Sequence, residues 1–194
     1  NILSVINKKL ISMAVIVALT ISLTSCNEVE NDDPELLIGN EGTEFALSLA
    51  NRYPFRSPYS QQETQAAEFI RSELIKLGYQ PVVSSFNKQI DEETVATSSN
   101  IVVKISGTGF VISEGNDKDE SIEEVRIFRQ VIIGAHYDTK FGSEHSEDYP
   151  DYDGINANAS GVGALLSVAA GLVGREIGYD VIIVFFGASN DDFA

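Results

Sequence analysis

The 194-residue chain is long enough for one domain with a sizeable core, and 43% of its residues are hydrophobic. Its 13 basic and 29 acidic residues give a formal net charge of −16. A surface of this sign repels nucleic acid and anionic lipid, so we expect neither as a partner. The acidic charge does not identify a substrate, because excess surface carboxylates generally serve solubility.

The first 25 residues have the organisation of a bacterial lipoprotein signal peptide. Lys8 and Lys9 form a basic start, an apolar run follows, and Leu-Thr-Ser precedes Cys26, the only cysteine in the chain. An apolar run of this length is short for a membrane-spanning helix and typical of a signal peptide. We therefore expect lipidation of Cys26 and export to the bacterial cell envelope, with the lipid as the only membrane contact. The alternative is a buried helix followed by a core cysteine.

Residues 26–42 are polar and acidic and are expected to form a tether, while residues 43–194 form the folded domain. Hydrophobic periodicity and turn residues predict the elements of this domain. In chain order they are a helix beginning near Thr43, a helix over 62–77 capped by Gly78, strands over 81–86 and 100–105, a solvated hairpin loop over 107–124, a strand over 125–134, a helix over 162–173 and a strand over 181–186.

The last predicted strand indicates the fold class. Residues 181–186 are apolar at every position, which is typical of a central strand covered by helices on both faces. The order strand, loop, helix, strand between residues 125 and 186 makes a right-handed crossover unit. We therefore expect an α/β fold in which 125–134 and 181–186 are neighbours in the sheet.

Polar side chains follow both of these strands. His136 and Asp138 follow the first strand, and Ser189 and Asn190 follow the second. In open α/β sheets, functional sites form beyond the carboxyl ends of the strands. An imidazole is a common zinc ligand, and a nearby carboxylate can hold its second nitrogen. The His-x-Asp pattern therefore indicates a metal ligand with an orienting carboxylate, and a structural, hydrogen-bonded histidine remains the alternative.

Three segments carry a resemblance to a known family when they are taken in order. They are Gly-Ala-His-Tyr-Asp-Thr at 134–139, Gly-Ile-Asn-Ala-Asn-Ala-Ser-Gly at 154–161, and Phe-Phe-Gly-Ala at 185–188. They resemble the motifs of peptidase family M28, zinc exopeptidases that include bacterial aminopeptidases, glutamate carboxypeptidase, glutaminyl cyclases and the transferrin receptor. The similarity runs from about Thr43 to the last residue. It implies a three-layer sandwich, with a mostly parallel mixed sheet flanked by helices and the C-terminal part missing.

The resemblance also implies zinc as the family's cofactor and a role for each position. His136 would be a zinc ligand and Asp138 its orienting carboxylate. The family's bridging Asp falls on Ala157, its general-base Glu on Ser189, and the next ligand Glu on Asn190. Alanine has no ligand atom, a serine hydroxyl is no base near neutral pH, and an amide oxygen is a poor zinc ligand.

We therefore expect zinc binding to be weak or absent, and hydrolysis of N-terminal peptide bonds to be lost or impaired. Two further ligands of the family, an acid and a histidine, have no counterpart in the sequence. Asp153, Asp191 and Asp192 lie near the substituted positions, but zinc bond lengths tolerate only about 0.2 Å of error. The acidic loop 144–153, which contains His145, is expected to lie solvated over the site.

Alternative functions stay open beside an impaired aminopeptidase. One is a non-catalytic module that binds a peptide or protein partner, as the transferrin receptor shows the family can. A second is a glutaminyl cyclase-like protein, which would need the same absent acids. A third is a truncated gene product, because the sequence stops just after a central apolar strand and would leave an open sheet edge. The DNA beyond codon 194 would distinguish them, and the oligomeric state is open.

The lipoprotein assignment predicts that Cys26 carries fatty acid. Cells that express the chain and are fed a palmitate analogue should yield labelled protein, and Cys26→Ala should abolish the label. Label that persists in Cys26→Ala would refute the assignment.

Overall fold

The computed structural model describes residues 40–115 and 122–191. The signal-peptide segment with Cys26, most of the expected tether, and Asp192 lie outside the described residues. The helices are α2 (Asn40–Arg52), α3 (Gln61–Lys76) and α4 (Ser160–Leu172), with short helical turns at Ser143–His145 and Ile155–Ala159. The strands are β1 (Val82–Gln89), β2 (Val95–Ile105), β3 (Phe110–Gly115), β4 (Ile122–Ile127), β5 (Gln130–His136) and β6 (Asp180–Phe186).

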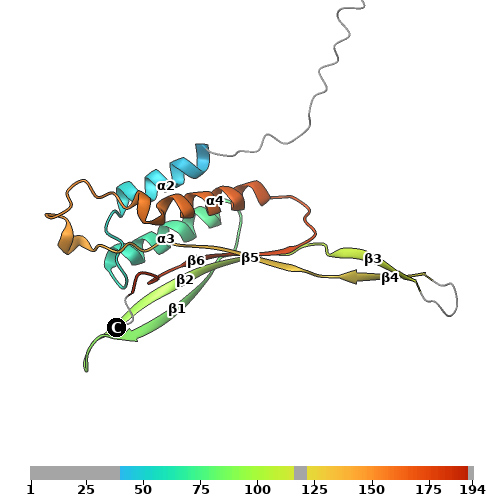
Figure 1. The fold of residues 1–194 in the computed structure, drawn as a ribbon, viewed down its shortest axis with the longest axis horizontal. Helices are drawn as coiled ribbons and strands as arrows, with labels where there is room; N and C mark the ends of the chain where they lie inside the picture. The colour runs from blue at the N-terminus through green and yellow to red at the C-terminus, as the bar shows by residue number, and fades with distance from the viewer. Residues whose placement is uncertain (1–39, 116–121, 192–194) are drawn as a thin grey trace, which may run out of the picture. The chain divides into compact units, whose positions relative to one another are not determined.

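The main sheet has the strand order β1-β2-β6-β5, and β3 and β4 form a separate two-stranded sheet (Figure 1). β5 and β6 are parallel neighbours joined through α4, and β6 lies inside the sheet between β2 and β5. The expected mixed α/β fold and the adjacency of these two strands are confirmed. β1 with β2 and β2 with β6 pair antiparallel, so parallel pairing is less common than expected.

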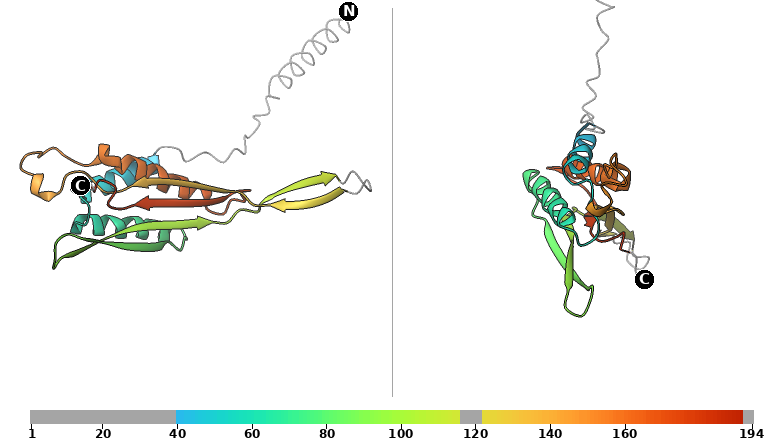
Figure 2. Two further views of the ribbon diagram at one scale, coloured as in Figure 1. Left: turned by 60° about the horizontal axis from the view of Figure 1, so that its bottom comes forward. Right: turned by 90° about the vertical axis from the view of Figure 1, so that its left-hand side faces the viewer.

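Helices cover one face of the main sheet among the described residues (Figure 2). Ile101 and Ile183, on β2 and β6, point into this helical layer and are fully buried, as the two-residue side-chain period of a strand requires. On the opposite face, Ile132 is 64% exposed and Phe186 is 39% exposed. The second helical layer that the apolar strand indicated is therefore not found within residues 40–115 and 122–191.

Small residues allow the helices to pack closely. A side-chain carbon at Gly163 of α4 would lie 2.1 Å from the carbonyl oxygen of Gly42, so α2 and α4 make backbone contact at this point. The segment Ile155–Leu172 has the length and hydropathy of a membrane span. Its residues Val162 and Leu166 are fully buried in the core cluster, as in the central helix of a globular domain.

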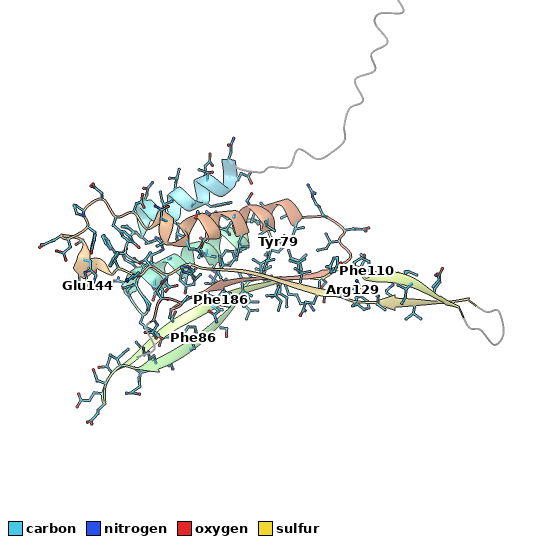
Figure 3. The ribbon with its side chains drawn as sticks, viewed as in Figure 1. Tyr79, Phe86, Phe110, Arg129, Glu144 and Phe186 are labelled. Carbon is cyan, nitrogen blue, oxygen red and sulfur yellow. The ribbon has the colours of Figure 1, made fainter. Side chains whose placement is uncertain are left out.

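The hairpin expected over 107–124 is present, and its arms are the regular strands β3 and β4, which pair antiparallel. The single strand expected over 125–134 is wrong. β4 ends at Ile127 and β5 begins at Gln130, because the chain leaves one sheet and enters the other between them. Arg129 marks this crossing: its carbonyl accepts a hydrogen bond from the Asp180 N–H, and its guanidinium lies 5.9 Å from the Phe110 ring centroid (Figure 3).

Candidate functional site

The parallel pairing of β5 and β6 brings their carboxyl ends together. His136 is the last residue of β5 and is paired with Phe186, the last residue of β6. The Tyr137 N–H donates to the Phe186 carbonyl at 2.9 Å, which extends the pairing by one residue. The turn that follows β6 then carries Ser189 and Asn190. The structure thus brings His136, Asp138 and Asn190 together, while Ser189 is exposed.

Asn190 binds directly to the His136–Asp138 pair. Its backbone N–H donates to Asp138 Oδ2 at 2.6 Å, and its side-chain Nδ2 donates to the same oxygen at 3.0 Å. Nδ2 also lies 3.3 Å from the Asp138 carbonyl and 3.4 Å from His136 Nδ1. Two N–H groups of Asn190 therefore occupy Asp138 Oδ2, an oxygen that a positively charged group could otherwise bind.

Asp138 is fully buried and orients the imidazole of His136. His136 Nδ1 lies 3.3 Å from Asp138 Oδ1 and 3.2 Å from the Asp138 carbonyl. The hydrogen bond to Asp138 raises the pKa of His136 above its ordinary value of 6.5, whereas burial and the positive charge of Arg56 oppose the rise. Because the Nδ1 side faces Asp138, Nε2 is the nitrogen available to a ligand, and the side chain is 34% exposed.

The second motif contacts the backbone of His136 through the side chain of Asn158. Asn158 adopts a left-handed conformation (φ 67°), and its Nδ2 donates to the His136 carbonyl at 2.9 Å. This contact fixes the motif loop against the end of β5. Ala157, which immediately precedes Asn158, contributes its backbone carbonyl to the neighbourhood of Arg56. The correspondence between Ala157 and the family's bridging Asp stays a prediction.

Arg56, which the sequence analysis missed, joins both motif loops from the inside. Its side chain is fully buried and donates to the Tyr137 carbonyl at 2.7 Å and the Gly154 carbonyl at 3.0 Å. It also donates to the Tyr53 carbonyl, and its own carbonyl accepts from Thr139 N–H at 2.9 Å. Burial lowers the pKa of Arg56 to about 10. Its only sequence signal is an arginine between two helix-breaking prolines, which does not predict burial.

The acids next to the substituted positions, Asp191 and Asp153, bind other partners. Asp191 accepts hydrogen bonds from Lys88 Nζ at 2.7 and 2.8 Å and from Tyr59 Oη at 3.0 Å, and the contact with Lys88 lowers its pKa. Asp153 accepts from the Ile155 N–H at 2.9 Å and so begins the second motif loop. Within residues 40–115 and 122–191, no three His, Cys, Asp or Glu side chains gather as a metal site. The described residues around His136 do not fit a zinc ion.

The loop that follows β5 contains an aromatic cluster that the sequence analysis did not predict. Phe141 stacks on Tyr149 with ring centroids 4.5 Å apart, and Tyr152 contacts Phe141 edge-on at 5.4 Å. Glu144 lies on this loop beyond the end of β5 (Figure 3). Tyr149 is 46% exposed, so part of this aromatic cluster faces solvent beside the acidic side chains of the loop.

The Arg56 contacts predict a large effect of one substitution on stability. Arg56→Met should lower the free energy of unfolding by about 2–4 kcal/mol, because several buried carbonyls lose their donor. Urea denaturation measures the change. Arg71→Met on the exposed side of α3 is the matched control and should cost less than about 0.5 kcal/mol. Equal losses in the two variants would contradict the role of Arg56.

His136 should titrate above pH 6.5 in the folded protein, and Asp138→Asn should lower its pKa. NMR of the imidazole protons measures both, with His145→Gln for assignment, since the chain has two histidines. A pKa raised in the folded state adds stability that is fully present below pH 6.5 and is lost as the pH rises through the folded pKa. An unchanged pKa in Asp138→Asn would show that the carboxylate does not act on the ring.

This chain matches one protein-family model and resembles solved structures. Residues 121–190 match the model of peptidase family M28. No curated protein sequence gives a significant match. A glutaminyl cyclase from Porphyromonas gingivalis has 20% identity and a TM-score of 0.56, over 81% of this chain and 50% of that one. A Zn-dependent exopeptidase from Parabacteroides distasonis has 20% identity and a TM-score of 0.54, over 79% and 49%.

A leucine aminopeptidase precursor from Bacteroides thetaiotaomicron has 19% identity and a TM-score of 0.52, over 75% of this chain and 45% of that one. The chain thus spans about half the length of the structures that it resembles. The shared fold covers three quarters or more of the chain, and the family match covers the segment with all three motifs. Together they bear out the resemblance found in the sequence: residues 121–190 are similar to peptidase family M28, and the chain shares the fold of these solved structures.

Proposed function

We propose that this domain is an exported zinc-exopeptidase-like module in which metal-dependent hydrolysis of N-terminal peptide bonds is lost or impaired. The observation that carries the proposal is the position of Asn190, whose amide nitrogen faces both Asp138 and His136. At this position Asn190 offers an amide in place of the carboxylate that a zinc ion would prefer. The lipid anchor at Cys26 and location in the cell envelope remain part of the proposal.

The chemistry of the proposed ancestral reaction explains why these positions matter. A zinc ion would polarise the scissile carbonyl while a carboxylate base takes a proton from water. At Ser189 the chain offers a hydroxyl, which does not act as a base near neutral pH. His136, positioned by Asp138, can still present Nε2 to a ligand. The described residues therefore retain a binding nitrogen without a complete catalytic set.

A peptide- or partner-binding role is the second candidate. The support for it is the exposed face of Tyr149 on the aromatic loop, which follows the His136–Asp138 segment in the chain. Solvent-accessible aromatic side chains next to a polar site are typical of ligand-binding surfaces. Glutaminyl cyclase-like chemistry is the related enzymatic alternative, and it would require the same carboxylates that Ala157 and Ser189 replace.

Zinc titration tests the proposal. The unmodified chain should bind zinc more weakly than about 1 µM, or about 8 kcal/mol, and should not turn over an aminoacyl reporter. The triple variant Ala157→Asp, Ser189→Glu, Asn190→Glu should bind zinc more tightly, because three carboxylates are placed near His136. Adding His136→Ala to this variant should remove the gain.

Two outcomes would overturn this assignment. One is a stoichiometric zinc site tighter than about 1 µM in the unmodified chain, with turnover that His136→Ala abolishes. The other is unchanged zinc affinity in a folded triple variant, which would show that the three positions do not converge on His136.

A further inference from the structure

Glu63 is a buried carboxylate in the first turn of α3. Ser60, the N-cap, accepts a hydrogen bond from the Glu63 N–H at 3.0 Å. A Glu three residues after a Ser N-cap ordinarily folds back onto the N-cap N–H in a capping box. Here the side chain is directed elsewhere and is 1% exposed. This departure indicates that the carboxylate has a different set of partners.

Three donors from separate segments converge on the two oxygens of Glu63. Oε1 accepts from Ser98 Oγ on β2 at 2.7 Å and from the Ala188 N–H at 2.7 Å, and Oε2 accepts from the Tyr59 N–H at 2.5 Å. The carboxylate thus joins the loop before α3, the edge of β2 and the turn after β6. The positive end of the α3 helix dipole favours a negative group at this position.

The two backbone donors have unusual conformations in common. Tyr59 and Ala188 have φ values of 63° and 49°, and with Asn158 they are the positive-φ residues other than glycine within residues 40–115 and 122–191. A left-handed conformation is unfavourable for a residue with a side chain and persists only where the surroundings enforce it. One carboxylate therefore holds two strained turns, one with each oxygen.

The turn at Ala188 positions the residues next to His136. Ser189 and Asn190 follow it directly, and Asn190 binds Asp138 through both its backbone and its side chain. The preceding residue, Gly187, has no room for a side chain, because a side-chain carbon there would lie 2.4 Å from Ser98 Oγ. A change in the Ala188 conformation would thus move Asn190 relative to the His136–Asp138 pair.

We infer that Glu63 is a positioning residue that holds the strained turn at Ala188 and thereby places Asn190 on the His136–Asp138 pair. The inference goes beyond the proposed function, since it concerns how the turn is held whether or not the site binds a ligand. It requires no metal and no substrate for its test.

Amide hydrogen exchange in the unmodified protein provides the first test. The N–H groups of Tyr59 and Ala188 lie outside helices and strands, yet they should exchange as slowly as those in β6. Glu63→Gln keeps the size but replaces one acceptor oxygen by a donor. Exchange at one or both of these amides should then become roughly tenfold to hundredfold faster, and the exchange rate at Tyr137 should stay the same.

The matched control and the rescue variant separate positioning from general stability. Glu68→Gln changes an exposed acid of the same helix and should alter no signal at Ala188. Glu63→Gln should shift the NMR signals of the Asn190 side-chain amide and the His136 ring. Adding Ala188→Gly should restore them, because glycine adopts the left-handed turn without help from Glu63.

Three outcomes would refute the inference. The first is rapid exchange of the Tyr59 and Ala188 amides in the unmodified protein, which needs no variant to fold. The second is acceleration in Glu63→Gln that is uniform over the domain, as expected for a purely global role. The third is failure of Ala188→Gly to restore the Asn190 and His136 signals, or to restore folding if Glu63→Gln alone does not fold.

Discussion

The arrangement of the site depends on one buried cation that binds backbone carbonyls. Arg56 is fully buried, and its hydrogen bonds reach the carbonyls of Tyr137 and Gly154, which belong to the first and second motif loops. A guanidinium offers five donors in a rigid plane, so one side chain can hold several loops in a fixed relation. Asp138 and Asp153 provide negative potential that partly offsets the cost of burying this charge.

Several polar side chains lie around this cation, and one buried oxygen among them, Asp138 Oδ1, accepts no well-aligned hydrogen bond within the described part of the chain. Asp138 accepts hydrogen bonds from the backbone and side-chain amides of Asn190, interacts electrostatically with Arg56, and raises the pKa of His136. On the outer side, Asp191 joins Tyr59 to Lys88 of β1. Buried polar groups are costly when unpaired and rigid when satisfied. In the described residues, hydrogen bonds thus join the ends of β5 and β6, and the Asn190 amide lies beside His136.

The elements with regular periodicity could be predicted from the sequence. The apolar face of α3 and its Gly78 cap, which has a φ of 93°, agree with the expected helix to within one residue. The unbroken apolar run of β6 correctly indicated an inner strand beside β5. The hairpin expected over 107–124 is present, but the single strand expected over 125–134 is wrong, because strand pairing with a distant partner decides where β4 ends and β5 begins.

The sequence by itself determined the fold class, the family resemblance and the place of His136 and Asp138 at a strand end, since these follow from local pattern and from motif order. Only the tertiary structure decided the roles of Arg56 and Glu63. Each acts on atoms far along the chain: Arg56 reaches Gly154, and Glu63 reaches Ala188. Local sequence carries no signal for such contacts, because an arginine or a glutamate is usually solvated. Burial and partners at long sequence separation exist only once the sheet and helices have assembled.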